Sequence, residues 1–391
     1  MTDRLVQSFN EYYGSGVMSD KIMCCFAPGR VNLIGEHIDY NGGCVFPCAL
    51  DMGTYMLVRK RKDSMINLIS LNMPLKVSID LKEDIIFNPV DTWANYPKGI
   101  IRYFKYMGID LCGMDILYYG NIPNGSGLSS SASIEVVTAY ALNEVFNAGL
   151  SLLKLVQLSQ EVEQRFIGVN CGIMDQFAVG FGKQNTAILL DCNTLAYEYV
   201  PLNPGNYRIV ICNSNKKRGL SDSKYNERRK ECENALINLQ KHIDAKNLCD
   251  LTIEEFEAFS EAVEDPVHRR RAQHAVYENA RVKEAVSLLN ADDIAKFGEL
   301  MVKSHYSLSE LYEVSCPELD VLVDEALKVE GTLGARMTGA GFGGCTVNIV
   351  RETSIEDFIR NVSLNYEKRA GLKADIYIAV AGDGVRAADN S

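Results

Sequence analysis

Residues 28–43 concentrate side chains that can bind a polar ligand. Within this stretch Arg30, Glu36, His37 and Asp39 fall inside ten residues, with glycines on both sides. Each hydroxyl group of a sugar both donates and accepts hydrogen bonds, and carboxylates bind such groups strongly. The pattern therefore fits the lining of a sugar site. It fits equally a polar turn held by a structural arginine–carboxylate pair, and composition alone leaves both interpretations open.

A run of small residues at 123–133 lies between an expected strand and an expected helix. It reads Pro-Asn-Gly-Ser-Gly-Leu-Ser-Ser-Ser-Ala-Ser. Small side chains let phosphate oxygens approach backbone N–H groups, and a helix N-terminus adds a positive dipole. The run lacks the Gly-Lys-Ser/Thr sequence of a Walker A loop, so a phosphate site here would be of another type. Taken alone, an ordinary turn with a serine N-cap is the simpler interpretation.

Two further segments could carry chemistry. Residues 336–346 hold four glycines within six residues, which permits close approach of backbones, either around a ligand or at a tight structural crossing. Residues 171–177 set Asp175 among apolar neighbours just after an expected helix. An aspartate that caps the next helix would have the same local pattern.

The apolar patterns around these segments predict the elements that position them. Strands are expected at 22–27, 54–59, 65–70, 114–119, 187–190, 207–212, 345–350 and 375–381. Helices are expected within 1–20, from near Ser131, along an apolar stripe over 155–166, and through most of 220–330. A mixed first half and a helix-then-strand second half predict two α+β domains, 1–204 and 205–391.

Composition narrows the classes of function. A chain of 391 residues is too long for one ordinary core, and its net charge of −11 argues against binding to nucleic acid or to an acidic membrane. The 12 cysteines form no Cys-x-x-Cys pair, which indicates reduced thiols and no zinc site. We see no signal peptide and no apolar run of ~20 residues, so we expect a cytoplasmic protein without a membrane partner.

Together the four segments resemble the galactokinase family, within the larger group of kinases that includes homoserine and mevalonate kinases. The resemblance extends from about residue 22 to about residue 384. Residues 29–43 resemble the galactokinase signature, 127–133 the phosphate-binding loop, and 337–345 the third motif. One departure is Ile38, where galactokinases usually carry threonine. Kinases for N-acetylgalactosamine in the same family often have isoleucine at this position.

The resemblance implies a fold and an activity. The N-terminal domain should be like ribosomal protein S5 and the C-terminal domain ferredoxin-like, with the active site between them. The implied reaction is the phosphorylation of the anomeric hydroxyl of galactose by ATP, with Mg²⁺ as the cofactor. The implied partners are these small-molecule substrates alone, and the implied assembly is a monomer.

The resemblance also implies residue roles. Asp175 matches the carboxylate that faces the anomeric hydroxyl and is the candidate base. Arg30 matches its partner, which would keep Asp175 ionised and stabilise charge on the transferring phosphoryl group. The positions that hold the sugar match Glu36, His37, Asp39, Gly172 and Tyr225. The positions that bind ATP match Trp93, Tyr96, Gly125, Ser126, Gly127, Leu128, Ser129, Ser130 and Ser131. The magnesium positions match Ser131 and Glu163, with Ser130 as an alternative to Ser131.

Two alternatives to a galactokinase stay open at this level. One is a family kinase for another sugar, such as N-acetylgalactosamine, arabinose or a uronic acid. The other is a sensor that binds sugar and ATP without catalysis. Sensors of that type have a disrupted phosphate loop, whereas residues 129–133 are unbroken here and both Arg30 and Asp175 are present.

Overall fold

The computed structural model describes residues 1–15, 21–123, 126–202, 205–216 and 221–388. Its largest sheet has the strand order β13-β1-β3-β6-β4-β5, with antiparallel pairs except for β4 beside β6. The strands are β1 (Met23–Asn32), β3 (Pro47–Lys60), β4 (Met65–Ser70), β5 (Lys76–Asp80), β6 (Met114–Gly120) and β13 (Arg386–Ala387). The first sequence segment therefore begins inside a central strand of this sheet.

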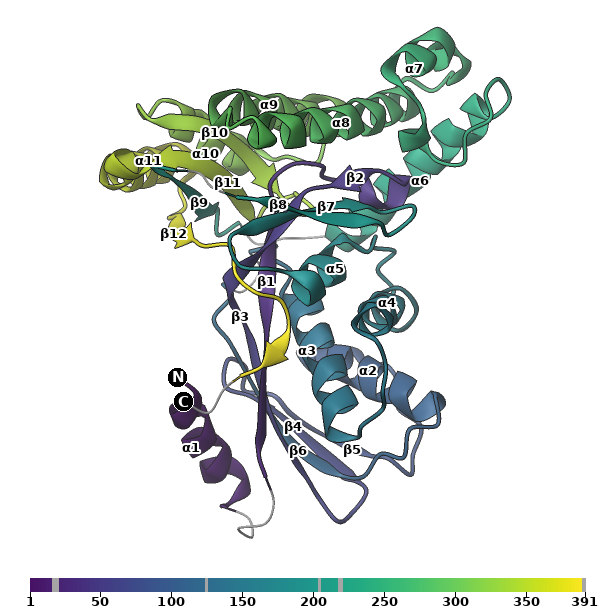
Figure 1. Cartoon of the computed structure of the whole chain (residues 1–391), viewed down its shortest axis with the longest axis vertical. Helices are drawn as coiled ribbons and strands as arrows, with labels where there is room; N and C mark the ends of the chain where they lie inside the picture. The colour runs from purple at the N-terminus through teal and green to yellow at the C-terminus, as the bar shows by residue number, and fades with distance from the viewer. Residues whose placement is uncertain (16–20, 124–125, 203–204, 217–220, 389–391) are drawn as a thin grey trace.

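Successive side chains along β3 point to opposite faces of this sheet and pack into two different cores. Met56 and Val58 point into a core shared with four helices, while Leu57 packs under α1 (Thr2–Tyr13) against Leu5. The four helices are α2 (Asn95–Tyr106), α3 (Ser130–Val145), α4 (Leu152–Val162) and α5 (Met174–Phe181). Figure 1 shows α1 on one side of the sheet and these four helices on the other.

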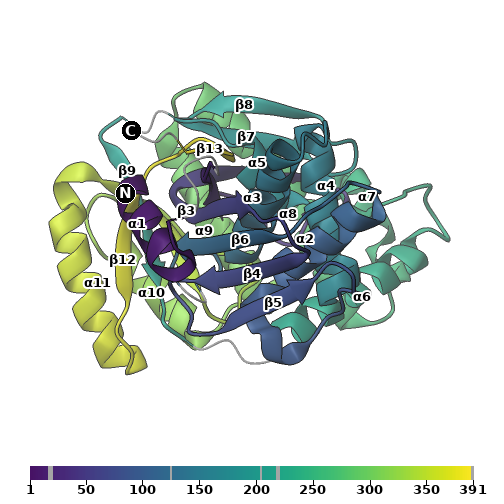
Figure 2. The same ribbon diagram turned by 90° about the horizontal axis from the view of Figure 1, so that it is seen from below.

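A second sheet, with the order β10-β11-β9-β12, is antiparallel throughout. It contains β9 (Tyr207–Asn213), β10 (Thr332–Thr338), β11 (Cys345–Arg351) and β12 (Asp375–Ala379). One face packs on α10 (Pro317–Leu327) and α11 (Ile355–Ala370), and α9 (Ile294–Tyr306) contacts β10. Figure 2 shows α11 and β12 together at one edge of the molecule.

The remaining elements join the two sheets. A small sheet of β2 (Cys44–Val45), β7 (Thr186–Asp191) and β8 (Tyr197–Pro201) lies between them (Figure 1). The other α-helices of the described chain are α6 (Ser221–Leu239), α7 (Ile253–Phe259) and α8 (Pro266–Asn290). One apolar core runs from Val31 and Leu33 in the first half to Met337 and Val347 in the second. Among the described helices, none is both long enough and apolar enough to span a bilayer.

The strands predicted from apolar runs all coincide with observed strands, and α3 begins one residue before the predicted start. The stripe over 155–166 is helical, but α4 ends at Val162 and a π-helical turn (Glu163–Ile167) follows. Strands β5 and β8 were not predicted because each buries a single side chain and so lacks an apolar run. Helix α11 was also missed, although its buried residues are spaced by three and four.

The predicted α+β class is confirmed, with helices and sheets in both halves. The domain boundary near residue 204 stays a prediction. The end of the chain crosses that boundary, because Cys25 of β1 pairs with Ala387 of β13. The first sheet is therefore completed by residues from the C-terminal end of the sequence.

Candidate active site

A cavity of about 220 Å³ brings all four sequence segments together. It is lined by Arg30, Glu36, His37, Asp39, Tyr96, Gly127, Ser129, Ser130, Ser131, Glu163, Val169, Cys171, Gly172, Met174, Asp175, Tyr225, Gly339 and Ala340. These residues come from both halves of the sequence. A volume of this size is suited to a small polar molecule.

The centre of the cavity is the ion pair between Arg30 of β1 and Asp175 of α5. Arg30 Nε donates to Asp175 Oδ1 over 2.7 Å, and Nη2 lies 2.6 Å from the same oxygen. Arg30 Nη1 donates to the carbonyl oxygen of Gly127 over 2.8 Å. Burial alone would lower the pKa of Arg30, but the carboxylates of Asp175 and Glu36 raise it, so the guanidinium stays charged. The Asp175 side chain is 29% exposed and faces the cavity.

The described part of the small-residue run places Ser129 against Asp175. Ser129 lies at the N-cap position of α3 with a left-handed backbone (φ 61°), but its side chain makes no capping hydrogen bond. Its hydroxyl donates instead to Asp175 Oδ2 over 2.6 Å. Asp175 does not occupy the N-cap position of α5, which is Ile173. The capping interpretation is therefore wrong for both residues, whose side chains meet across the cavity.

Glu163 and Ser131 also come together at this cavity. The Ser131 hydroxyl is hydrogen-bonded to the Glu163 carboxyl group, and Gln176 Nε2 donates to Glu163 Oε2 over 2.6 Å. Burial raises the pKa of Glu163 to about 7, and the charge of Asp175 adds to the effect. Ser130 lines the cavity as well. Within the described chain, no group of three or more His, Cys, Asp or Glu side chains could hold a metal ion.

The donor set of Ser131 and Glu163 nevertheless fits magnesium. This ion keeps several waters and needs only one or two protein oxygens together with phosphate oxygens. A structural zinc or calcium site would need a larger protein ligand set.

Glu36 connects the first segment to the third. Its Oε1 accepts hydrogen bonds from Thr338 Oγ1 over 2.9 Å and from the Gly339 amide over 2.6 Å, and its Oε2 accepts from Asn32 Nδ2 over 2.7 Å. The side chain is only 1% exposed, although it reaches the cavity wall. Glu36 therefore holds the two glycine-rich segments together at this wall.

Asp39 and Gly172 form a tight contact at another wall of the cavity. A Cβ atom on residue 172 would lie 2.0 Å from Asp39 Oδ2, so only glycine fits there. The Asp39 carboxyl group accepts hydrogen bonds from the backbone of Tyr40 and Met174. Burial raises the pKa of Asp39 to about 7, and the neighbouring Asp175 carboxylate contributes.

His37 and Tyr225 pack against each other on the same side of the cavity. Their ring centroids are 5.3 Å apart. Both ring nitrogens of His37 have partners, since Nδ1 lies 2.8 Å from the Tyr40 hydroxyl and Nε2 lies 3.2 Å from the carbonyl oxygen of Ala340. Burial lowers the pKa of His37 to about 3, and nearby His274 adds to the effect, so the imidazole is neutral.

Several predicted ATP-binding residues lie outside this cavity. Trp93 belongs to the 3-10 helix η2 (Pro89–Ala94), where its ring packs 5.7 Å from that of Tyr118 and its indole nitrogen is buried without a partner. Ser126 is 1% exposed, and its hydroxyl also lacks a partner. Leu128 is a core residue. The prediction for Gly125 falls outside the described residues. Tyr96, Gly127 and Ser129–Ser131 do line the cavity.

Gly339 and Ala340 of the third segment line the cavity, although the sequence pattern predicted no individual role for either residue. Gly339 has φ 82°, and a Cβ atom there would lie 2.9 Å from the carbonyl oxygen of Gly127. The glycine run therefore lets two backbones touch, as the sequence predicts. Cys171 and Met174 also line the cavity. Their proximity to Asp175 in the sequence was the only indication.

Comparisons with known proteins agree with this geometry. A model of the GHMP kinase N-terminal domain matches residues 95–183, and a model of the GHMP kinase C-terminal domain matches residues 285–368. The crystal structure of a mevalonate kinase from Methanococcus jannaschii shares the fold, with a TM-score of 0.66 at 22% identity over 94% of this chain and 99% of that one. The fold and the site thus define a GHMP kinase, with N- and C-terminal domains of mixed helices and sheets.

More specific matches exist within that class. The galactokinase galactose-binding signature matches residues 7–60. Galactokinase from Clostridium tetani is 54% identical over 98% of this chain and 96% of its own length, and the Bacillus subtilis galactokinase is 50% identical over 92% and 93%. The crystal structure of Lactococcus lactis galactokinase complexed with galactose has a TM-score of 0.95 at 44% identity, covering 99% of this chain and all of that one. The chain belongs to the galactokinase family, a group of sugar kinases.

Proposed function

We propose that the protein transfers the terminal phosphoryl group of ATP to the anomeric C1 hydroxyl of α-D-galactose, giving galactose 1-phosphate. This reaction would be the first committed step of galactose catabolism. The observation that carries the proposal is the Arg30–Asp175 ion pair, which faces a small cavity beside the N-terminus of α3. Relatives at 50–54% identity and a structural neighbour with galactose in its crystal support it.

Asp175 is the residue we assign as the base. Oδ1 accepts from Arg30 and Oδ2 accepts from Ser129, which fixes the orientation of the carboxylate toward the cavity. A proton from the sugar hydroxyl would move to an Asp175 oxygen as the new O–P bond forms. Arg30 would orient the carboxylate and stabilise negative charge on the transferring group.

The ATP phosphates would lie against the small-residue run at the start of α3. Gly127 lines the cavity at this place, and the helix N-terminus contributes positive charge at Ser130 and Ser131. Ser131 and Glu163 would hold Mg²⁺, which neutralises phosphate charge when bound. We place Trp93 and Tyr96 near the adenine, on the resemblance of their segment to the family.

Two residues bear on the choice of sugar. Ile38, the departure from the family signature, is fully buried in the core, packs against Gly43 and does not line the cavity. Asp39 does line it and is the residue we expect to read the ring near the 4-hydroxyl. A pocket fitted to a 2-hydroxyl group would reject the larger acetamido group by a steric clash. We therefore favour galactose over N-acetylgalactosamine.

The test is the rate of ADP release over a panel of sugars at saturating magnesium-ATP. We expect kcat/KM for galactose to exceed that for glucose and for N-acetylgalactosamine by at least ~10²-fold, since sites built to bond a hydroxyl discriminate strongly. Comparable rates on N-acetylgalactosamine, arabinose or a uronic acid would reassign the substrate. Binding of galactose and ATP without ADP release would indicate a sensor. We also expect a cytoplasmic monomer, which gel filtration and cell fractionation would check.

A further inference from the structure

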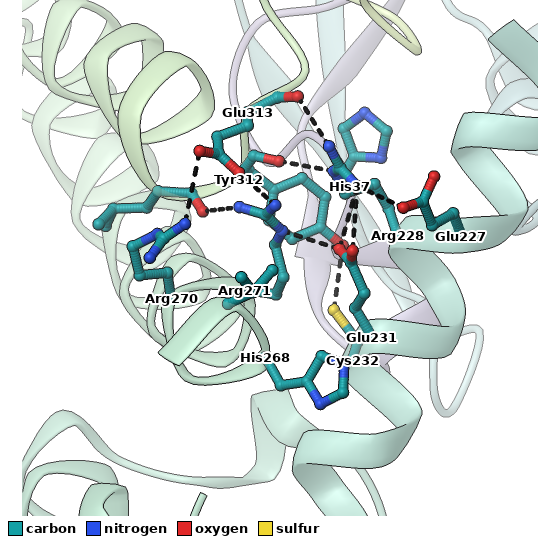
Figure 3. A network of polar contacts seen from close by, with 12 residues as sticks. His37, Glu227, Arg228, Glu231, Cys232, His268, Arg270, Arg271, Tyr312 and Glu313 are labelled. Atoms are coloured by element: carbon teal, nitrogen blue, oxygen red, sulfur yellow. Dashed lines mark hydrogen bonds and ion pairs between the residues drawn. The ribbon is translucent and has the colours of Figure 1, made fainter. Parts of the chain in front are cut away.

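Two arginines on different helices hold the turn that follows the π-helical segment Ser307–Leu311. Arg228 of α6 donates from Nε to the carbonyl oxygen of Tyr312 over 2.8 Å and from Nη2 to that of Glu313 over 3.1 Å. Arg271 of α8 donates from Nη1 to the carbonyl oxygen of Leu311. Three consecutive carbonyl groups are thus bound by guanidinium groups (Figure 3), which fixes the position of this turn.

Two glutamates connect these arginines to each other and to the turn. Glu231 lies 3.1 Å from Arg228 Nη1 and 2.8 Å from Arg271 Nε. Glu313 pairs with Arg271 and, over 3.4 Å, with Arg270. We call Arg228, Glu231, Arg271 and Glu313 the ion-pair belt. Arg228 and Arg271 are largely buried and have partners on the turn and on Glu231, so they fix α6 and α8 against the turn.

The turn directs the Tyr312 side chain inward, where it begins a chain of hydrogen bonds. The Tyr312 hydroxyl lies 2.8 Å from that of Tyr40, and the Tyr40 hydroxyl lies 2.8 Å from His37 Nδ1. The Cys232 thiol lies 3.1 Å from the Tyr312 hydroxyl. We call Cys232, Tyr312, Tyr40 and His37 the hydroxyl chain. Tyr312 is fully buried, so its hydroxyl depends on these partners.

A single carbonyl group sets the direction of every bond in the hydroxyl chain. The carbonyl oxygen of Ala340 only accepts, so neutral His37 must carry its proton on Nε2 and accept at Nδ1. Tyr40 then donates to His37 and accepts from Tyr312. Tyr312 donates to Tyr40 and accepts from the thiol of Cys232. Each proton of the chain is then donated to one partner, so the direction of every bond follows from the tautomer of His37.

The hydroxyl chain ends at the wall of the cavity, whereas the ion-pair belt stays outside it. His37 and Ala340 both line the cavity, and neither Arg228 nor Arg271 does. Tyr225 lies one helical turn before Arg228 on α6, and its ring packs 5.3 Å from that of Tyr40. The belt and the chain therefore connect to the sugar side of the cavity. The Arg30–Asp175 pair has separate hydrogen-bond partners.

We propose that Tyr312 is a positioning residue for the sugar. Its hydroxyl, placed by the ion-pair belt, holds His37 in its orientation through Tyr40, and so sets the affinity for the sugar and not the rate of phosphoryl transfer. This inference rests on the proposed function, because it concerns the sugar side of the same site. It adds residues from α6, α8 and the 311–313 turn to those that determine sugar binding.

The experiment compares three tyrosine-to-phenylalanine variants of the full chain. Tyr312→Phe should raise the KM for the sugar by about 2- to 10-fold, the usual range for one neutral hydrogen bond, with kcat and the KM for ATP within about 2-fold of wild type. Tyr40→Phe should raise the sugar KM further, since it removes the donor to His37 itself. Tyr366→Phe is the matched control, because Tyr366 is fully buried and donates to the carbonyl oxygen of Ser214 over 2.7 Å.

Three outcomes would overturn the proposal. They are an unchanged sugar KM in Tyr312→Phe, a fall in kcat without a rise in KM, and an equal rise in KM in Tyr366→Phe. The sugar used is whichever one the wild-type enzyme phosphorylates best, so a different substrate would refute the proposed function and leave this test intact.

A second measurement does not depend on the folding of any variant. The ¹⁵N shifts of the His37 imidazole in the wild-type protein should show Nε2 protonated and Nδ1 unprotonated at neutral pH. A proton on Nδ1 would reverse the direction of the hydroxyl chain and overturn the proposal.

Discussion

Two buried arginines, Arg30 and Arg271, illustrate what separates a reactive ion pair from a structural one. Their side chains are 4% and 2% exposed, and each binds a carboxylate at hydrogen-bond distance and a backbone carbonyl group. By burial and pairing alone the two are equivalent. The difference lies in what else their partners can contact.

Asp175, the partner of Arg30, borders an open cavity, so its carboxylate can meet a ligand as well as the arginine. Glu231, a partner of Arg271, is instead placed between two arginines and does not border that cavity. Arg271 also donates hydrogen bonds to the Glu313 carboxylate and to the carbonyl oxygen of Leu311. A buried ion pair therefore indicates a reactive site only where one partner keeps access to a cavity.

The largest effect should come from Asp175→Asn. The amide keeps the shape of the side chain but cannot accept the hydroxyl proton, so kcat should fall by ~10²–10⁴-fold while sugar binding stays close to wild type. The measurement is steady-state ADP release together with calorimetric titration of the sugar. The matched change in the belt, Glu231→Gln, should leave kcat within a few-fold.

Near-normal kcat in Asp175→Asn would show that this carboxylate orients the substrate without acting as the base. Arg30→Ala would then decide whether charge stabilisation alone supports the reaction. A loss of kcat with little change in sugar KM is the result expected for an arginine that acts on the transition state.

The next effect is on stability, and here the substitution of Arg271 should matter more than the substitution of Arg30. Arg271→Ala leaves the buried carbonyl group of Leu311 without its donor and removes one of two arginine partners from each glutamate of the belt. It should lower the free energy of unfolding by about 1–3 kcal/mol. Arg30→Ala should cost less, because its carboxylate partner reaches water through the cavity. Urea unfolding of both variants is the measurement. Equal losses would remove the distinction between the two pairs.

A smaller effect concerns the metal. Glu163→Gln removes a charged oxygen ligand and should raise the magnesium concentration needed for half-maximal activity by about tenfold or more. Glu161→Gln is the control, because Glu161 lies two residues earlier in the chain, in α4, but pairs with Arg165 at the surface. An unchanged magnesium requirement in Glu163→Gln would exclude Glu163 from the metal site.

The smallest effect is a pH dependence at Asp39, a buried carboxyl group flanked by other acids. Its pKa is raised to about 7, so the folded protein holds this proton more tightly than the unfolded chain does. The stability that it contributes is full below the ordinary pKa of aspartate and is lost as pH rises through about 7. Asp39→Asn cannot ionise, so its stability relative to wild type should increase between pH 5 and pH 8. Urea unfolding at both pH values checks this, and a constant difference would contradict it.

The sequence by itself determined the elements that depend on neighbours only a few residues away. Runs of apolar residues marked β1, β4, β6 and β11, and apolar residues spaced by three and four marked α3. The glycine-rich segments stood out for the same reason, because backbone freedom is a local property. Those segments were also sufficient to show the resemblance to the galactokinase family.

Only the tertiary structure decided which of these segments meet. Arg30 and Asp175 are 145 positions apart and pair because β1 and α5 pack together. Asp175 and Ser129 had plausible local roles as helix caps, but each turns its side chain toward the other instead. The close contact of Gly172 with Asp39 likewise could not be predicted from the sequence. Local preferences act over a few residues, whereas contacts between distant segments depend on how whole sheets and helices pack. The site could therefore be identified only from the packed structure.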